Sequence, residues 1–200
     1  MTAPDRYAVW APEPDRVRLV VDDVEYPLTK GDDDWWSTDA VMPVVGARYG
    51  FRIGDDDEVR AAPRSRYQPE GVHGPSEVVD PARFAWTDES WTGRPARGAV
   101  IYEMHIGTYT PEGTLDAAAQ KLDHLVELGV EFVELLPVNA VNGEWNWGYD
   151  GVGWFSVHAP YGGPDAYDRF VDTAHALGLG VIQDVVYNHL GPSGNYLPLY

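Results

Sequence analysis

The second half of the chain alternates short apolar runs with amphipathic segments, and this order constrains the fold more than any other feature. Residues 100–105, 132–136 and 181–185 are mainly apolar segments of strand length. Between them, residues 115–126 and 164–177 place apolar side chains at the i, i+3, i+4, i+7 spacing of an amphipathic helix. A strand–helix–strand–helix–strand order predicts a parallel sheet with right-handed crossovers.

Residues at the expected helix ends support both helices. Thr114 is suited to cap the first helix and Gly129 stands at its C′ position. Pro164 fits the first turn of the second helix, and Gly178 closes it. The predicted apolar faces comprise Leu115, Ala118, Ala119, Leu122, Leu125 and Val126 in the first helix and Phe170, Val171, Ala174 and Leu177 in the second.

Three strands cannot close a barrel, so the pattern leaves two architectures open. The segment is either a small open α/β sheet or the first part of an eight-stranded barrel. The long loop over residues 138–163, rich in Trp, Gly, Asn and Tyr, favours the barrel, because functional loops lengthen at the carboxyl ends of barrel strands.

The first third of the chain shows the two-residue alternation of half-buried strands. Apolar residues at 47, 49, 51 and 53 alternate with Arg48, Gly50 and Arg52, and similar patterns occur at 17–21 and 7–9. Acidic, glycine-containing tracts separate these runs as turns. We expect a β-sandwich over residues 1–85, a connection over 86–98, and the start of a (β/α) barrel, strands 1 to 3, over 99–200.

Composition excludes several classes of protein. A formal net charge of −18 argues against a nucleic-acid partner, because phosphate contacts need clustered basic residues. The chain has no cysteine, which excludes disulfides and thiolate metal sites. We find no secretory leader and no apolar run approaching the roughly 18 residues of a membrane span. The expectation is a soluble cytoplasmic protein with no membrane partner.

Two polar segments carry candidate chemistry. Residues 184–189, Asp-Val-Val-Tyr-Asn-His, follow the third strand, where a barrel delivers residues to its catalytic face. Residues 144–150, Glu-Trp-Asn-Trp-Gly-Tyr-Asp, combine aromatic rings with polar side chains. Sugars present apolar ring faces fringed by hydroxyls, so this combination is typical of a carbohydrate site.

These motifs resemble those of the α-amylase superfamily, glycoside hydrolase family 13. Residues 184–189 are similar to its first signature region, and 147–150 to the loop whose tyrosine stacks under the sugar at the cleavage subsite. Within the family, the chain most resembles the maltooligosyltrehalose trehalohydrolases. The segments that carry this resemblance are residues 63–80, 107–114, 158–165 and 188–196. The resemblance implies an immunoglobulin-like sandwich of the glycan-binding type, followed by the first three β/α units of an incomplete TIM barrel.

The resemblance also implies substrate-binding roles. Tyr149 is expected to stack on the sugar, His189 to hydrogen-bond it, and Asp184 to support the floor of the site. Trp147 is a further substrate-binding candidate, although Trp147 and its neighbour Trp145 could instead pack the loop onto the barrel rim.

Two further polar residues, Asn188 and His105, are weaker candidates for the site. Asn188 matches a position that ligates calcium in many α-amylases. Calcium needs six to eight oxygen ligands and the sequence offers no obvious remaining set, so we expect no metal and no cofactor. His105, at the end of the first strand, could line the pocket floor or be a buried, hydrogen-bonded core residue.

Retaining glycosidases need a carboxylate nucleophile and a carboxylic acid about 5–5.5 Å apart. The family takes these from its fourth and fifth barrel strands, and a further Asp follows the seventh. We therefore expect no catalytic residue in this chain, because Glu103, Glu144 and Asp150 match none of those positions.

The expected function is that of the N-terminal part of a retaining α-glucan hydrolase. It would release trehalose from maltooligosyl-trehalose by cleaving the adjoining α-1,4-glucosidic bond. The alternatives are a fragment of a glycogen branching or debranching enzyme, or a non-catalytic α-glucan-binding protein that uses Trp10, Trp35 and Trp36.

Overall fold

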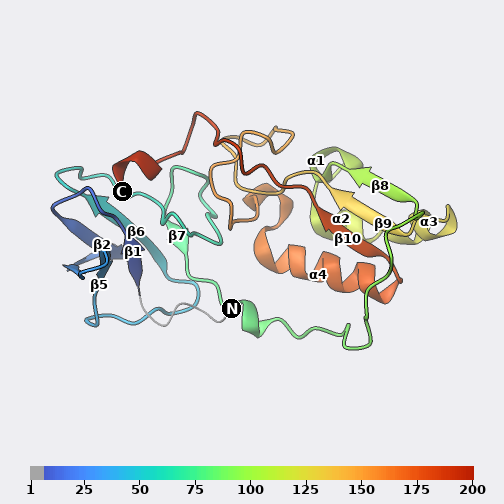
Figure 1. Ribbon diagram of the computed structural model, residues 1–200, viewed down its shortest axis with the longest axis horizontal. Helices are drawn as coiled ribbons and strands as arrows, with labels where there is room; N and C mark the ends of the chain where they lie inside the picture. Colours follow the sequence, from blue (N-terminus) through green and yellow to red (C-terminus); the bar gives the residue numbers. More distant parts are fainter. Residues whose placement is uncertain (1–6) are drawn as a thin grey trace.

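The computed structural model describes residues 7–200, which form two groups of elements with separate hydrophobic cores. Figure 1 shows the N-terminal strands at one end of the elongated molecule and the parallel sheet with its helices at the other. Within residues 7–200, no helix is long and apolar enough to cross a membrane.

The N-terminal group contains two antiparallel sheets. Their strands are β1 (Ala8–Trp10), β2 (Val17–Val21), β3 (Val24–Pro27), β4 (Thr29–Lys30), β5 (Trp35–Ser37), β6 (Arg48–Ile53) and β7 (Ser76–Glu77). One sheet has the order β1-β5-β4 and the other β3-β2-β6-β7. Both sheets contribute to one core, in which Val9 and Trp36 from the first sheet join Leu19 and Phe51 from the second.

The acidic tract after β2 forms the predicted turn. Asp22 and Asp23 have φ angles of 44° and 67°, so both central residues of the two-residue β2–β3 hairpin are left-handed. This geometry matches the twist of the flanking strands, and Asp tolerates it better than most residues. The Asp22 carboxylate also accepts a hydrogen bond from the Arg48 backbone N–H at 2.9 Å, which ties the turn to β6.

The strict alternation predicted for β6 is wrong at Gly50, which is buried. The segment that follows β6 folds back over it, and Phe51 and Arg60 exchange two backbone hydrogen bonds of 2.9 and 2.8 Å. A Cβ atom at Gly50 would lie 2.5 Å from Val59 Cγ1 and 2.6 Å from the Arg60 carbonyl oxygen. Glycine is therefore required by a close backbone approach at this position.

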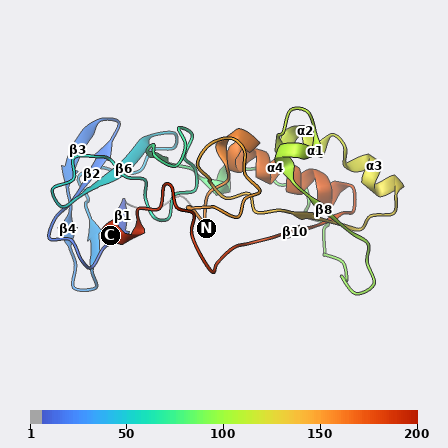
Figure 2. The ribbon, with the colours of Figure 1, turned by 90° about the horizontal axis from the view of Figure 1, so that it is seen from above.

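The second group is built on the predicted parallel sheet. Its strands are β8 (Ile101–Met104), β9 (Phe132–Leu135) and β10 (Gly180–Gln183), in the order β10-β9-β8. The helices lie on one side of the sheet (Figure 2), where Val133 and Leu135 are fully buried. On the other face, Glu103 pairs with Glu134 in the β8–β9 register.

The helices are α1 (Ile106–Tyr109), α2 (Leu115–Ala119), α3 (Leu122–Glu127) and α4 (Gly163–Ala176). Short 3-10 turns form η1 (Pro81–Arg83), η2 (Ala159–Tyr161) and η3 (Leu197–Leu199). The second predicted helix corresponds to α4, with Pro164 in its first turn and Phe170 and Ala174 fully buried.

The prediction of one continuous helix over residues 115–126 is wrong, because the chain tightens between α2 and α3. Lys121 N–H donates to the Ala118 carbonyl at 3.0 Å, an i to i+3 bond that ends α2. The tightened turn keeps Leu122 in the core but leaves Val126 40% exposed. The predicted N-cap is confirmed, since the Thr114 side chain accepts from the Ala117 N–H.

The third strand ends at Gln183, two residues before its predicted end. Its partner β9 ends at Leu135, and the last ladder bond runs from the Asp184 N–H to the Leu135 carbonyl at 3.0 Å. Two residues beyond Leu135, Pro137 has no N–H with which to extend the ladder. Asp184 therefore lies directly after the strand.

The last residues return to the N-terminal sheets, although the sequence pattern assigned them to the second group (Figure 1). Tyr200 is 7% exposed in the N-terminal core, and its hydroxyl donates to the Ala61 carbonyl at 2.9 Å. Its ring meets Phe51 edge-on, with centroids 6.3 Å apart. This contact joins Tyr200 to the N-terminal group across 139 residues of sequence.

Replacing Tyr200 should therefore destabilise the N-terminal sheets. We expect Tyr200→Ala to lower the free energy of unfolding by about 3 kcal/mol through loss of ring packing. Tyr200→Phe keeps the ring and loses one hydrogen bond, so about 1 kcal/mol is expected. Urea denaturation followed by tryptophan fluorescence measures both. An unchanged midpoint for Tyr200→Ala would contradict the packing.

Candidate functional site

The carboxyl ends of the three parallel strands meet at one edge of the second sheet. The register pairs Met104 with Leu135 and Leu135 with Gln183, so the residues that follow each strand lie at the same edge. His105 follows β8 and Asp184 follows β10. The loop over residues 138–163 supplies further side chains here, and ligands commonly bind at such an edge.

Three of the four predicted substrate-binding residues are joined by hydrogen bonds. The Tyr149 hydroxyl donates to Asp184 Oδ2 at 2.9 Å. His189 Nε2 lies 2.8 Å from the Tyr149 carbonyl oxygen and must donate to it, because a carbonyl only accepts. A neutral His189 ring therefore offers Nδ1 as an acceptor and donates a second hydrogen bond only when protonated.

The fourth residue, Trp147, is held against His105. Their ring centroids are 4.7 Å apart at 53°, and the indole remains 62% exposed. Trp145 is 82% exposed, so it does not pack the loop onto the rest of the chain. Tyr149 is 41% exposed, and the loop thus presents three accessible aromatic rings.

His105 is half-buried and has partners at both ring nitrogens. Nε2 donates to the Asn146 carbonyl at 2.8 Å, and the Tyr161 hydroxyl lies 3.1 Å from the same nitrogen. Nδ1 lies 3.0 Å from the Thr108 hydroxyl, which can donate to it. His105 therefore anchors the loop. Sequence reasoning had left its role open and had not considered Tyr161, which lies in a 3-10 turn without apolar periodicity.

The loop is also fixed by close backbone packing. Gly148 has a φ of +93°, and a Cβ atom there would lie 2.0 Å from the Pro137 carbonyl oxygen. The Asn146 side chain accepts from the Gly148 N–H at 2.8 Å and donates to Asp150 Oδ2 at 3.1 Å. These contacts place Tyr149, the next residue, over the strand edge.

The site is acidic around the Tyr149 phenol. The hydrogen bond to Asp184 raises the pKa of Tyr149, and burial and the negative charges of Asp184, Glu103 and Glu134 act in the same direction. Tyr149 therefore remains a neutral phenol at physiological pH. Carboxylates, a neutral phenol oxygen that can accept, and exposed rings form a surface suited to an uncharged, hydroxyl-rich ligand.

Asn188 is exposed and lies after the strand, in the same segment as His189. Within residues 7–200, no cluster of three or more His, Asp or Glu side chains has an arrangement that could hold a metal ion.

Comparison with known proteins adds three findings. The family described as "Alpha amylase, catalytic domain" matches residues 78–197. The malto-oligosyltrehalose trehalohydrolase of Rhizobium sp. (strain M-11) is 56% identical over 98% of this chain and 34% of its own length. A 1,4-alpha-glucan branching enzyme of Xanthomonas euvesicatoria pv. vesicatoria is 34% identical over 92% of this chain and 27% of its own.

A solved structure agrees with both the sequence match and the fold. A crystal structure from Salmonella typhimurium, provisionally designated an alpha amylase, is 44% identical and has a TM-score of 0.93. The match covers 97% of this chain and 33% of that one. The chain thus spans about a third of the length of the relatives that it matches.

Within the loop, the buried side chain of His158 should make stability pH-dependent. It is 4% exposed, packs edge-on against Tyr161, and burial lowers its pKa to about 4. Because an unfolded histidine takes up its proton near pH 6.5, the stabilisation is complete above that pH and is lost as pH falls towards 4. We expect a loss of roughly 2–3 kcal/mol between pH 7 and 4.5.

The variant His158→Gln cannot titrate and serves as the comparison. Denaturation curves of both proteins at pH 7 and 4.5 measure the difference. Wild type should lose more stability than the variant on acidification. Equal losses would show that His158 does not stay neutral in the folded chain.

Proposed function

Because the chain belongs to the alpha-amylase family, we propose that it is the N-terminal part of a retaining α-glucan hydrolase. The intact protein would release trehalose from maltooligosyl-trehalose by hydrolysing the adjoining α-1,4-glucosidic bond. The observation that carries this proposal is the linked arrangement of Tyr149, Asp184 and His189 at the carboxyl edge of the parallel strands.

Sequence similarity favours this activity over its nearest alternative. The trehalohydrolase relative is 56% identical, whereas the branching enzyme is 34% identical over a similar share of the chain. A branching or debranching enzyme remains the second candidate, because the same edge would suit any α-glucan. A non-catalytic glucan-binding protein is the third.

We propose a matching domain organisation. Residues 1–85 would form an immunoglobulin-like sandwich of the glycan-binding type, 86–98 a connection, and 99–200 the first three units of a TIM barrel. Two sheets around one core support the first assignment. For the barrel, the helices lie on one face of β10-β9-β8, and the opposite face carries Glu103 and Glu134 as residues of the barrel interior.

Each residue of the proposed site would act on the sugar through its own chemistry. Tyr149 would stack its ring on the apolar face of the glucosyl unit at the cleavage position. Asp184, by accepting from the Tyr149 hydroxyl, would orient that ring. His189 would accept a sugar hydroxyl at Nδ1, and Trp147 would supply a second apolar surface beside it.

A retaining reaction also needs a nucleophile and an acid about 5–5.5 Å apart. In this proposal those carboxylates belong to later strands of the intact enzyme, and residues 7–200 bind and orient the substrate. The role of the chain is then to lower the activation barrier by holding the sugar, not by bond-making.

The 200-residue chain alone should therefore have no hydrolase activity. We expect no trehalose from maltooligosyl-trehalose, and no reducing ends from starch, above a buffer blank. Coupled trehalose assay of the purified chain measures this. Turnover that co-purifies with the chain and disappears in Asp184→Ala would overturn the assignment of catalysis to other strands.

In a full-length protein carrying this chain, Tyr149→Ala and His189→Ala should reduce kcat/KM mainly through kcat. For His189→Ala, losing one hydrogen bond costs up to about 1.5 kcal/mol, or up to about 3 kcal/mol if a buried partner is left unpaired, which corresponds to roughly tenfold to a hundredfold in rate. Tyr149→Ala removes the stacking ring and should cost a similar amount. Trp86→Ala removes an exposed ring away from the site and should leave the kinetics unchanged. If His189→Ala is destabilised but keeps the wild-type kcat, His189 has only a packing role.

A further inference from the structure

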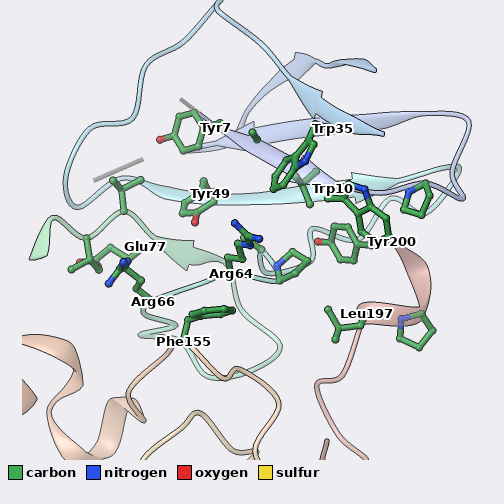
Figure 3. Close-up of a pocket in the computed structure, with 18 of the residues that line it drawn as sticks. Tyr7, Trp10, Trp35, Tyr49, Arg64, Arg66, Glu77, Phe155, Leu197 and Tyr200 are labelled. Atoms are coloured by element: carbon green, nitrogen blue, oxygen red, sulfur yellow. The ribbon is translucent and has the colours of Figure 1, made fainter. Parts of the chain in front are cut away.

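A second groove lies away from the Tyr149 site, between the β1–β5 sheet and two segments of the second group. It has a volume of about 1050 Å³ and is lined by aromatic rings and charged side chains (Figure 3). None of Trp147, Tyr149, Asp184 or His189 lines it. We propose that this groove binds an α-1,4-glucan chain, as a site separate from the one at the strand edge.

An aromatic pair forms one wall of the groove. Trp10 and Trp35 are directly opposite each other in the antiparallel β1–β5 ladder, so their side chains lie on the same face of the sheet. Trp10 is 52% exposed. The adjacent pair, Val9 and Trp36, faces the core instead, and the Trp36 indole donates to the Ala11 carbonyl at 2.8 Å. The pattern therefore separates two groove tryptophans from one core tryptophan.

Two arginines contribute unused hydrogen-bond donors. The Arg64 guanidinium lies over the Trp35 ring at 5.3 Å from its centroid, and Arg66 lines the groove nearby (Figure 3). Neither guanidinium forms a hydrogen bond or ion pair with another residue of 7–200. Guanidinium groups donate in a planar fork that matches neighbouring hydroxyls of a sugar ring.

The charge of the groove favours a neutral ligand over an anion. Glu13 and Glu77 line it together with the two arginines, and Glu77 is already paired with Arg48. An anionic ligand would gain from the arginines but would be repelled by these carboxylates in a chain of net charge −18. A polyol can accept from arginine and donate to glutamate, while its apolar face covers the tryptophans.

Size and position indicate a chain of sugars. The volume of about 1050 Å³ lies just above the roughly 300–1,000 Å³ of small-molecule pockets, which is more than one sugar needs. Phe155, on the groove wall, belongs to the loop that also carries Trp147 and Tyr149. Leu197 belongs to the segment that follows His189. The same two segments thus border both sites, as a linear glucan spanning them would require.

The ligand class rests on the proposed function, but the test measures binding and not hydrolysis. Maltoheptaose would be titrated into the 200-residue chain by calorimetry, with folding of each variant checked by its melting temperature. Trp10→Ala and Trp35→Ala should each weaken binding about tenfold, equivalent to 1.4 kcal/mol. Arg64→Ala should weaken it less. Trp86→Ala removes a 42% exposed ring that lies outside both the groove and the strand edge, so it is the matched control and should bind as wild type.

Several results would overturn the proposal. These are the absence of saturable binding, equal affinity in Trp10→Ala and wild type, or loss of all binding in Tyr149→Ala with Trp10→Ala unaffected. Displacement of maltoheptaose by millimolar inorganic phosphate would make the groove an anion site instead. A different outcome would support both sites as separate: full-length His189→Ala loses hydrolysis, while the 200-residue chain with the same substitution still binds maltoheptaose normally.

Discussion

The backbone contact between Gly148 and the Pro137 carbonyl is the constraint on which the candidate site depends. No residue with a Cβ atom fits there, because that atom would lie 2.0 Å from the carbonyl oxygen. The contact brings the loop down onto the end of β9, so the next residue, Tyr149, reaches Asp184 at the end of β10. The hydrogen bond between the phenol and Asp184 and the hydrogen bond between His189 and the Tyr149 carbonyl both depend on this approach.

Polar contacts then hold the loop where packing has placed it. His105, at the end of β8, donates to the Asn146 carbonyl, and His189 donates to the Tyr149 carbonyl. Each strand end thus contributes a contact to one loop, which fixes exposed side chains on a rigid base. Pre-organised groups lose less conformational entropy when a ligand binds, which suits a site made of accessible rings.

The regular elements could be predicted from the sequence because their signals are local. Apolar runs and helix-capping residues such as Thr114 mark the β-α-β-α-β order directly. The break at Lys121 was missed because an i to i+3 turn preserves the same apolar spacing as a helix. Tyr149, Asp184 and His189 came from a family resemblance. Contacts such as His105 with Tyr161, 56 residues apart, and Tyr200 with Ala61 depend on loop paths that carry no periodic signal.

The most direct test of the Gly148 constraint is a measurement of the pKa of Tyr149. This pKa is measured by NMR on protein whose tyrosines are labelled at Cζ, and the Tyr149 signal is assigned with the variant Tyr149→Phe. The hydrogen bond to Asp184 raises this pKa in the wild-type chain. In Gly148→Ala the loop should be displaced, and the pKa should fall back towards the ordinary value near 10. Gly143→Ala, also at positive φ but with nothing within 4 Å of its Cβ, should titrate as wild type. A raised pKa that persists in Gly148→Ala would contradict the account.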